Sequence, residues 1–260
     1  MNTQDLAQRI TDYWNHQPCN VAHSSAEIGT QGYFDEVTAK RYRAEPHILD
    51  FAGFHIWRGK RVLEIGSGIG TDAEQFARHG AEFVGIDISQ ESLMLSRQRF
   101  AVYELDGEFH PGSVADMDFL KTLGKFDLVY SYGVPHHFPG MRGHLTNVRE
   151  LLQPQGELRF MVYAKNSWKY AMIQKGLDQF EAQAQCPYAE AFTKDEIYAL
   201  VEGIFHIERI RQDHCFMYNV PAYKEGRFEL EPWFDAMPEL MRAAVREYLG
   251  WHLLIKARRL

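Results

Sequence analysis

A glycine-rich loop between a predicted strand and a predicted helix is the feature that most restricts how this chain can fold. The apolar run at residues 61–65 is typical of a buried strand, and it leads directly into Gly66, Gly68 and Gly70 with the spacing G-x-G-x-G. An amphipathic segment at residues 73–78 follows at once. Glycines at such a turn let the backbone bend sharply and let a ligand approach the backbone N–H groups without a Cβ in between. The pattern therefore predicts a strand, a tight turn and a helix start around a ligand.

A carboxylate downstream of this loop narrows the kind of ligand. Residues 83–87 read as the next buried strand, and this strand ends in Asp87. An acid about twenty residues after the first glycine of such a loop can reach a ribose diol in a βαβ unit. The dinucleotide fingerprint G-x-G-x-x-G does not fit, because position 71 is Thr. Loop and acid together predict a site for a nucleotide-like ligand other than a dinucleotide.

The hydrophobic pattern along the chain alternates between strands and helices. Strands are predicted near residues 61–65, 83–87, 107–111, 126–131, 157–163, 205–210 and 250–257, and helices near 72–79, 90–101 and 144–152. Such alternation indicates an α/β fold with a doubly wound, mostly parallel seven-stranded sheet and helices on both faces. The ligand is then expected at the carboxyl ends of the strands.

Three regions follow from this pattern. In the N-terminal region, helices are predicted around residues 6–14 and over residues 34–54, and the second of these has a break at Pro46. In the C-terminal region, residues 165–192 are helical in pattern and form an insert after strand five. This insert and the aromatic-rich segment 215–233 are the candidate walls of a substrate site. The regions are an N-terminal helical region at 1–57, a Rossmann-like α/β core at 58–164, and a substrate-side region at 165–260 that completes the sheet.

From about residue 58 to 164 the chain resembles the class I S-adenosylmethionine (SAM)-dependent methyltransferases. After the glycine loop and Asp87, the matching segments are GSVADMDF at 112–119, FDLVYSYGVPHHFP at 126–139 and LLQPQGEL at 151–158, in the order found in that family. The resemblance implies that the cofactor is SAM, that residues 1–57 fold over it as a lid, and that a methyl group is transferred to a small molecule by direct displacement. It does not indicate which atom of the acceptor is methylated.

The resemblance also implies a set of cofactor contacts. Arg43 is expected to pair with the methionine carboxylate, and the backbone N–H of Val114 with an adenine nitrogen, because Ser113 replaces the family's usual Asp. The full set comprises Tyr42, Arg43, Glu64, Gly66, Ser67, Gly68, Gly70, Thr71, Asp72, Asp87, Ile88, Ser113, Val114, Ala115, Ser131 and Tyr132.

Two adjacent histidines after the fourth core strand are the candidate catalytic residues. His137 is favoured over His136 as general base, since imidazole titrates near neutral pH, and Tyr163 at the end of strand five is expected to point toward them. Alternatively, one histidine packs in the structure while the other is solvated. No metal site is predicted, because the sequence places no further ligand beside the pair. The expected substrate-binding residues are Tyr13, Trp14, Tyr33, His136 and Trp168.

Charge and cysteine content limit the partners and the compartment. The net charge of −7 argues against nucleic-acid and membrane partners, which favour basic surfaces. Three scattered cysteines and the lack of a predicted leader indicate a cytoplasmic protein, expected as a monomer or homodimer. Besides methyl transfer, two alternatives stay open: a SAM-binding module without turnover that acts as a scaffold or regulator, and, more remotely, aminopropyl transfer involving Asp116 and Asp118.

Overall fold

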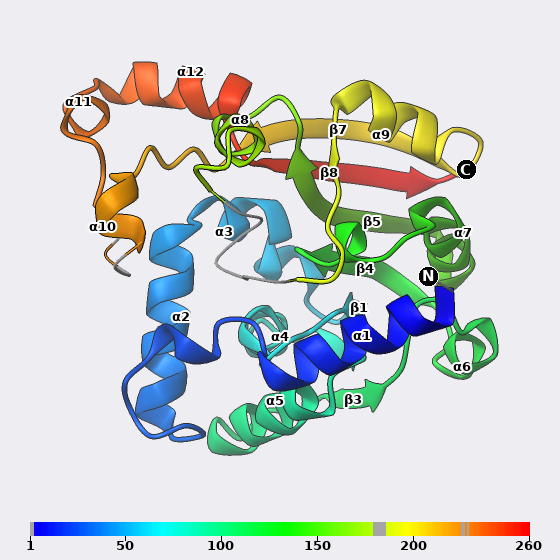
Figure 1. Ribbon diagram of the computed structural model, residues 1–260. Helices are drawn as coiled ribbons and strands as arrows, with labels where there is room; N and C mark the ends of the chain where they lie inside the picture. Colours follow the sequence, from blue (N-terminus) through cyan, green and yellow to red (C-terminus); the bar gives the residue numbers. More distant parts are fainter. Residues whose placement is uncertain (1–2, 179–185, 225–226, 228) are drawn as a thin grey trace.

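The computed structural model describes residues 3–178, 186–224, 227 and 229–260. In this part of the chain, one eight-stranded sheet forms the centre of the molecule (Figure 1). Its strands are β1 (Arg61–Ile65), β2 (Glu82–Asp87), β3 (Glu108–Pro111), β4 (Phe126–Tyr132), β5 (Leu152–Ala164), β6 (Ala191–Phe192), β7 (Phe205–Asp213) and β8 (His252–Arg259).

The strand order is β3-β2-β1-β4-β5-β8-β7, with β6 paired to the end of β5 outside this path. All pairs are parallel except those that β8 makes with β5 and β7. The predicted mostly parallel, doubly wound sheet is therefore confirmed, but its strand number is eight rather than seven. The additional strand, β6, has only two residues, too few to show a periodicity in the sequence.

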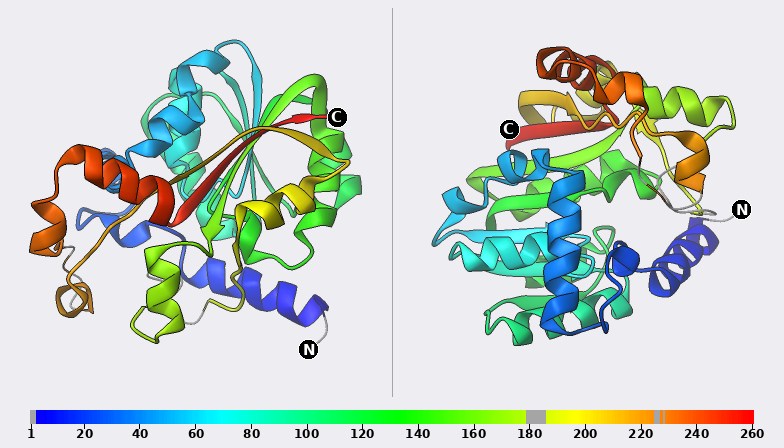
Figure 2. Two further views of the ribbon diagram at one scale, coloured as in Figure 1. Left: turned by 90° about the horizontal axis from the view of Figure 1, so that it is seen from above. Right: turned by 90° about the vertical axis from the view of Figure 1, so that its left-hand side faces the viewer.

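Helices cover both faces of the sheet (Figure 2). The described α-helices are α1 (Thr3–His16), α2 (Gln31–Ala44), α3 (His47–Ala52), α4 (Thr71–Arg78), α5 (Gln90–Val102), α6 (Met117–Thr122), α7 (Met141–Leu151), α8 (Trp168–Gln174), α9 (Lys194–Val201), α10 (Val220–Lys224), α11 (Pro232–Asp235) and α12 (Glu239–Leu249). Short 3₁₀ turns are η1 (Val21–His23), η2 (Phe54–Trp57) and η3 (Pro135–His137).

Two hydrophobic cores lie on opposite sides of the sheet. Leu63 and Ile65 of β1 join one core with residues of α7 and α9, whereas Val62 joins the other with residues of α3, α4 and α5. Successive side chains of a strand point to opposite faces. Burial of both faces explains why the core strands read as continuous apolar runs.

In the N-terminal region, the helical segment predicted over residues 34–54 is divided into α2 and α3, with the break at Pro46 as predicted. Thr30 caps the start of α2 by accepting a hydrogen bond from the N–H of Tyr33. The division lies at Pro46, which immediately precedes α3, because a proline is tolerated only at the start of a helix. Residues of α2 pack against Ile69 of the glycine loop.

The C-terminal region is less helical after β5 than predicted, and more helical before β8. In the predicted helical insert at 165–192, only α8 is a described helix, and residues 179–185 lie outside the described chain. The capping box of Thr193 and Glu196 at the start of α9 is confirmed. Helices α10 and α11 occupy the aromatic-rich segment, and α12 follows it.

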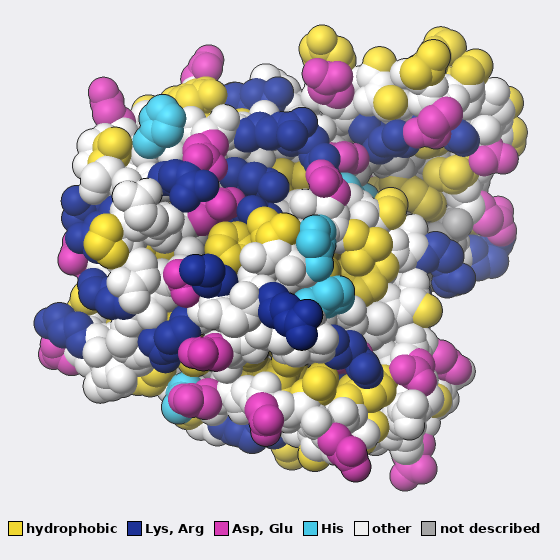
Figure 3. Space-filling model, turned by 180° about the vertical axis from the view of Figure 1, so that it is seen from behind, with side chains coloured by type: hydrophobic (Ala, Val, Ile, Leu, Met, Phe, Trp, Pro, Cys, Tyr) yellow, Lys and Arg dark blue, Asp and Glu magenta, His cyan; other side chains and the backbone are white. Residues whose placement is uncertain are grey.

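The surface mixes charges of both signs, and several of its large exposed apolar side chains lie on α11 and α12. Seen from behind, Lys and Arg side chains are interspersed with Asp and Glu (Figure 3). Trp233, Leu240, Met241 and Tyr248, on α11 and α12, are each more than half exposed. None of the described helices combines the length and the apolar character needed to span a lipid bilayer.

Candidate functional site

The glycine loop joins β1 to α4, and all three of its glycines have left-handed backbones. Their φ angles are 76° at Gly66, 53° at Gly68 and 77° at Gly70. A Cβ at Gly66 would lie 2.3 Å from Val134 Cγ2, and one at Gly70 would lie 3.0 Å from Ser96 Oγ. A Cβ at Gly68 would meet no described atom within 4 Å. Gly66 and Gly70 therefore let the loop pack against the protein, and Gly68 alone of the three faces open space.

Asp87, at the end of β2, is hydrogen-bonded to this loop. Its Oδ2 accepts from the Gly68 N–H at 2.9 Å, and its Oδ1 accepts from the Ser89 N–H at 2.8 Å. Burial raises the pKa of the Asp87 carboxyl, while hydrogen bonds from the backbone of Ser89 and Gly68 act against that rise. The fold thus brings the two motifs recognised in the sequence into direct contact.

Three buried polar atoms border the glycine loop without a hydrogen-bond partner in the described part of the chain. They are Glu64 Oε2 at the end of β1, Ser67 Oγ within the loop and Thr71 Oγ1 at the start of α4. Their residues are only 4%, 5% and 5% exposed. Buried polar atoms normally have partners, so three of them around one turn indicate a polar ligand. All three residues belong to the predicted cofactor set.

Asp72 uses its carboxylate to hold the N-terminal region against the core. Arg41 of α2 binds it with two hydrogen bonds, Nε to Oδ1 at 3.1 Å and Nη2 to Oδ2 at 3.0 Å. The hydroxyls of Tyr42 and Tyr130 donate to the same carboxylate, each at 2.9 Å. Asp72 and Tyr42, both in the predicted cofactor set, therefore connect α2, α4 and β4. Arg43 is exposed on α2.

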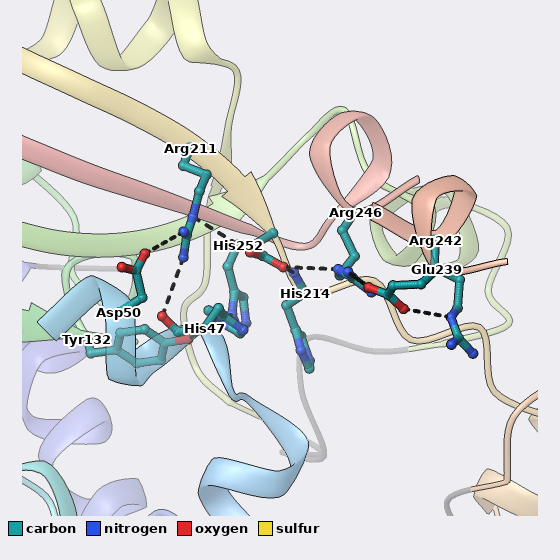
Figure 4. A network of polar contacts seen from close by, with 10 residues as sticks. His47, Asp50, Tyr132, Arg211, His214, Glu239, Arg242, Arg246 and His252 are labelled. Carbon is teal, nitrogen blue, oxygen red and sulfur yellow. Dashed lines mark hydrogen bonds and ion pairs between the residues drawn. The ribbon is translucent and has the colours of Figure 1, made fainter. Parts of the chain in front are cut away.

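At the end of β4 lie Ser131 and Tyr132, two further members of the predicted cofactor set. The Ser131 hydroxyl donates to the Ile65 carbonyl at 3.0 Å and so links β4 to β1. The Tyr132 hydroxyl lies 2.7 Å from His47 Nε2 and 3.0 Å from His252 Nδ1 (Figure 4). Burial, followed by the Glu45 carboxylate, raises the pKa of Tyr132 well above its usual value. Its phenol is therefore neutral at physiological pH.

The two candidate catalytic histidines are both buried in η3, beside Tyr163. His136 is 0% exposed and its ring centroid lies 3.7 Å from that of Tyr163. His137 is 3% exposed, and its Nδ1 lies 2.9 Å from the Tyr188 carbonyl oxygen. A carbonyl can only accept, so Nδ1 carries the proton and Nε2 is the basic nitrogen of the neutral ring. Neither histidine is solvated as the alternative prediction required of one of them.

The end of α1 reaches the loops that follow β2 and β4. The Trp14 carbonyl accepts from Ser89 Oγ at 3.2 Å, and Asn15 Oδ1 accepts from the Gln90 N–H at 2.9 Å. The Trp14 ring meets the His137 ring edge-on at 5.2 Å between centroids. Burial raises the pKa of the neighbouring Tyr13 to about 12, with Cys186 and Cys19 adding to the shift. Tyr13 and Trp14 thus lie beside the catalytic candidates, where the sequence predicted substrate-binding residues.

The remaining predicted residues are more dispersed. Tyr33 is completely buried in the α2 core, and its hydroxyl donates to the Val21 carbonyl at 2.9 Å. Trp168, at the start of α8, is 37% exposed. Among the residues expected near ribose and adenine, Ile88 and Val114 are half-buried. The Ser113 hydroxyl accepts from the Ala115 N–H at 3.2 Å, so it shapes the turn after β3.

Sequence reasoning missed Arg41, Tyr130 and Tyr188. A signal for Arg41 was present, because it follows Tyr33 and Val37 at intervals of four residues, which places it on the buried face of α2. Arg43 does not lie on that face. No sequence pattern connects Tyr188 with His137, since their contact depends on how the segment after α8 folds back.

Comparisons with known proteins agree with this architecture. Residues 63–158 match the family described as "Methyltransferase domain". A ubiquinone biosynthesis O-methyltransferase from Cereibacter sphaeroides is 28% identical over 159 residues, which cover 59% of this chain and 63% of the relative. A tRNA U34 carboxymethyltransferase from Citrifermentans bemidjiense is 34% identical over 148 residues, covering 56% of this chain and 42% of the relative. The chain thus spans less than two thirds of the length of either relative.

A solved structure extends the fold comparison to nearly the whole chain. The magnesium protoporphyrin IX methyltransferase from Synechocystis PCC 6803, solved with bound S-adenosylhomocysteine, superposes with a TM-score of 0.64. The alignment covers 98% of this chain and 100% of the other, at 15% sequence identity. At this identity the likeness concerns the fold, and it includes the N-terminal and C-terminal regions that the family match leaves out.

Proposed function

We propose that this chain, whose residues 63–158 match the methyltransferase-domain family, is a class I methyltransferase that transfers the methyl group of SAM to a small-molecule acceptor. The observation that carries this proposal is the glycine loop: Gly68 faces open space, Asp87 lies against it, and three buried polar atoms around it have no hydrogen-bond partner among the described residues. A ligand with hydroxyl, amine and carboxylate groups can satisfy such atoms, and SAM has all three kinds of group.

The residues around the loop fit the parts of SAM in sequence. Asp87 ends β2 with a half-buried carboxylate that can accept from ribose hydroxyls, and Val114 lies in the turn after β3 where adenine is expected. Glu64, Ser67 and Thr71 surround the turn itself and are available to the amino acid end of the ligand. Arg41 is engaged by Asp72, so its part in the proposal is to fix α2 beside the loop.

SAM supplies an activated methyl group on a sulfonium, so that a lone pair of the acceptor forms the new bond to carbon while the electrons of the broken C–S bond remain on sulfur. The protein has to align the acceptor, exclude water and remove a proton where the acceptor carries one. We assign proton removal to His137 Nε2, because the Tyr188 carbonyl fixes the proton of that ring on Nδ1. His136 lies between His137 and Tyr163 and positions both rings.

A small acceptor is favoured over a nucleic acid by charge and by the character of the site. The chain carries a net charge of −7, which repels a polyanion such as tRNA. The side chains beside His137 are the aromatic rings of Trp14 and Tyr163. Relatives are named both as ubiquinone biosynthesis O-methyltransferases and as a tRNA carboxymethyltransferase. The predicted cytoplasmic location and oligomeric state stay predictions.

The test combines binding with turnover. Isothermal calorimetry with S-adenosylhomocysteine should show one saturable site per chain. Methyl-labelled SAM should then transfer label to a component of a metabolite extract and not to purified tRNA. Binding without any labelled product across extracts would favour the alternative of a SAM-binding module without turnover. Absence of binding would refute the assignment of the glycine loop to SAM.

A further inference from the structure

Three histidines from distant parts of the chain converge on the substrate side of the sheet. His47 begins α3, His214 follows β7 and His252 begins β8. One ring nitrogen from each lies within 4.8 Å of the other two. Figure 4 shows the three side chains grouped beside Tyr132. Neither the predicted cofactor set nor the catalytic candidates include any of these histidines.

The spacing within the group is suited to a shared metal ion. Zinc binds imidazole nitrogen at about 2.1 Å, so two nitrogens on one ion lie roughly 3.0–3.4 Å apart. His47 Nε2 and His252 Nδ1 are 3.1 Å apart. The rings of His214 and His252 stack with centroids 4.5 Å apart, and a ring nitrogen of His214 lies within 4.8 Å of the other two, so the His214 ring has to turn toward them to share the ion. Two of the three ligands therefore already have the required separation.

Backbone contacts hold His214 at this position. Its N–H donates to Asp213 Oδ1 at 2.7 Å, and its carbonyl accepts from the Trp251 N–H at 2.8 Å. Its φ of 64° is a left-handed conformation that few residues other than glycine adopt. Because Trp251 directly precedes His252, the backbone bond aligns the two histidines as a unit.

The charges around the group are compatible with a cation. Glu45 lies beside the Tyr132 hydroxyl, and its Oε2 is buried without a described hydrogen-bond partner. The nearby guanidinium of Arg211 is paired with Asp50 at 2.6 Å and with Asp213 at 3.6 Å. Arg41 is neutralised by Asp72. The surrounding positive charges are thus compensated, and one carboxylate has acceptor capacity to spare.

We propose that His47, His214 and His252 form a binding site for one divalent transition-metal ion, with zinc as the reference ion. Three imidazoles are the protein ligands of many open zinc sites, in which water or a substrate atom takes the fourth position. The Tyr132 hydroxyl lies against the same two nitrogens, so its hydrogen bonds to His47 and His252 would give way to the ion. The site lies next to the methyl-transfer residues, because the His252 ring is 6.3 Å from that of Tyr163.

The competing interpretation is a hydrogen-bonded cluster that needs no metal. The Tyr132 hydroxyl, His47 Nε2 and His252 Nδ1 can satisfy one another if the two rings adopt complementary tautomers. Those hydrogen bonds join Tyr132, His47 and His252, whereas the metal site requires His214 as a ligand. Substitution of His214 therefore separates the two, and as the least buried of the three it is also the safest to replace.

The experiment measures metal binding without SAM, so its outcome is independent of the proposed function. Tag-free protein is stripped with EDTA, exchanged into metal-free buffer and titrated with ZnCl₂ in the calorimeter. We expect one zinc ion per chain, at least a tenfold weaker affinity in His214→Ala and His252→Ala, and an unchanged affinity in His206→Ala, whose histidine is exposed on β7. Circular dichroism checks that each variant is folded.

Cobalt gives a second readout on the unaltered chain. Co²⁺ bound by three imidazoles should show visible ligand-field absorption, which added zinc displaces and which His214→Ala loses. Tyr132→Phe should keep zinc affinity within about threefold, since the phenol is not a ligand in this proposal. The proposal is overturned if the wild-type chain shows no saturable zinc binding, or if His214→Ala binds zinc as tightly as the wild type and the His206→Ala control do.

Discussion

Replacing Arg41 by Met should destabilise the protein markedly, whereas replacing Arg43 by Met should not. The two arginines lie two residues apart on α2, but only Arg41 reaches Asp72. The Arg41 side chain is 14% exposed and that of Asp72 is 1% exposed, so the pair is largely shielded from water. Arg43 is exposed and serves as the matched control.

The expected cost follows from what remains around Asp72. Removing one partner of a buried ion pair costs about 3–5 kcal/mol, because the other charge stays buried without compensation. Tyr42 and Tyr130 would continue to donate to the Asp72 carboxylate, which lowers the penalty. We therefore expect about 3 kcal/mol for Arg41→Met and less than about 0.5 kcal/mol for Arg43→Met, the usual limit for a surface change.

Urea unfolding at pH 7, followed by circular dichroism, measures both variants. With a slope of about 1–3 kcal/mol per molar urea, a loss of 3 kcal/mol moves the midpoint by about 1 M or more. In an Asp72→Asn background, Arg41→Met should cost much less, because the charge that it compensates is gone. Equal midpoints for Arg41→Met and Arg43→Met would refute the argument that this ion pair holds α2 to the core.

Three further predictions concern the ligand site. Asp87→Ala should weaken S-adenosylhomocysteine binding at least about tenfold in calorimetry with the fold retained, and an unchanged affinity would remove Asp87 from the site. Gly68→Val and Gly66→Val should both abolish that binding with a near-native circular dichroism spectrum and lower the melting temperature, because valine is strained at their left-handed φ; the decrease should be larger for Gly66→Val, whose side chain also meets Val134. His137→Ala should reduce turnover by roughly 10²–10⁴-fold with cofactor affinity nearly intact, and full activity would exclude it as the base.

The core of the fold could be predicted because its signals are local. A parallel strand buried on both faces is a continuous apolar run, and a glycine turn followed by a helix shows its own spacing. The βαβ geometry predicted that Asp87 and the glycine loop serve one ligand, and the structure adds that Asp87 accepts a hydrogen bond from the Gly68 N–H. In contrast, the antiparallel insertion of β8 between β5 and β7 depends on strand pairing over long separations, which no local pattern reports.

Side-chain roles within the site were harder to predict, because they depend on which residues meet across elements. Asp72 looked like a cofactor ligand by its place after the loop, but Arg41 and Tyr130 arrive from elsewhere in the chain and bind it. The histidine pair drew attention by being adjacent in sequence. His47 and His252, separated by 205 residues, have no such signal although they lie 3.1 Å apart.

Glu64 offers the most direct test of whether the loop is built for a ligand rather than for stability. Its carboxylate is buried with one oxygen lacking a described partner. Burial, then the neighbouring Asp72 carboxylate, raises the pKa of Glu64 well above its usual value. A carboxyl whose pKa is raised on folding binds a proton more readily in the folded state, so this group lowers stability as the pH rises from its unfolded pKa toward its folded pKa.

Glu64→Gln removes this penalty, so the variant should be more stable than wild type at pH 7 by the order of 1 kcal/mol in urea unfolding. The difference should shrink as the pH falls and vanish below about 4.3, where the carboxyl is protonated in both states. Glu74 is the matched control, since it is equally buried but paired with Arg99 at 2.7 Å, so Glu74→Gln should destabilise. S-adenosylhomocysteine affinity should fall in Glu64→Gln, because the lost charge would otherwise accept hydrogen bonds from the ligand. If Glu64→Gln instead lowers stability at pH 7 as Glu74→Gln does, then Glu64 is a structural residue and the unpartnered oxygen does not mark a ligand contact.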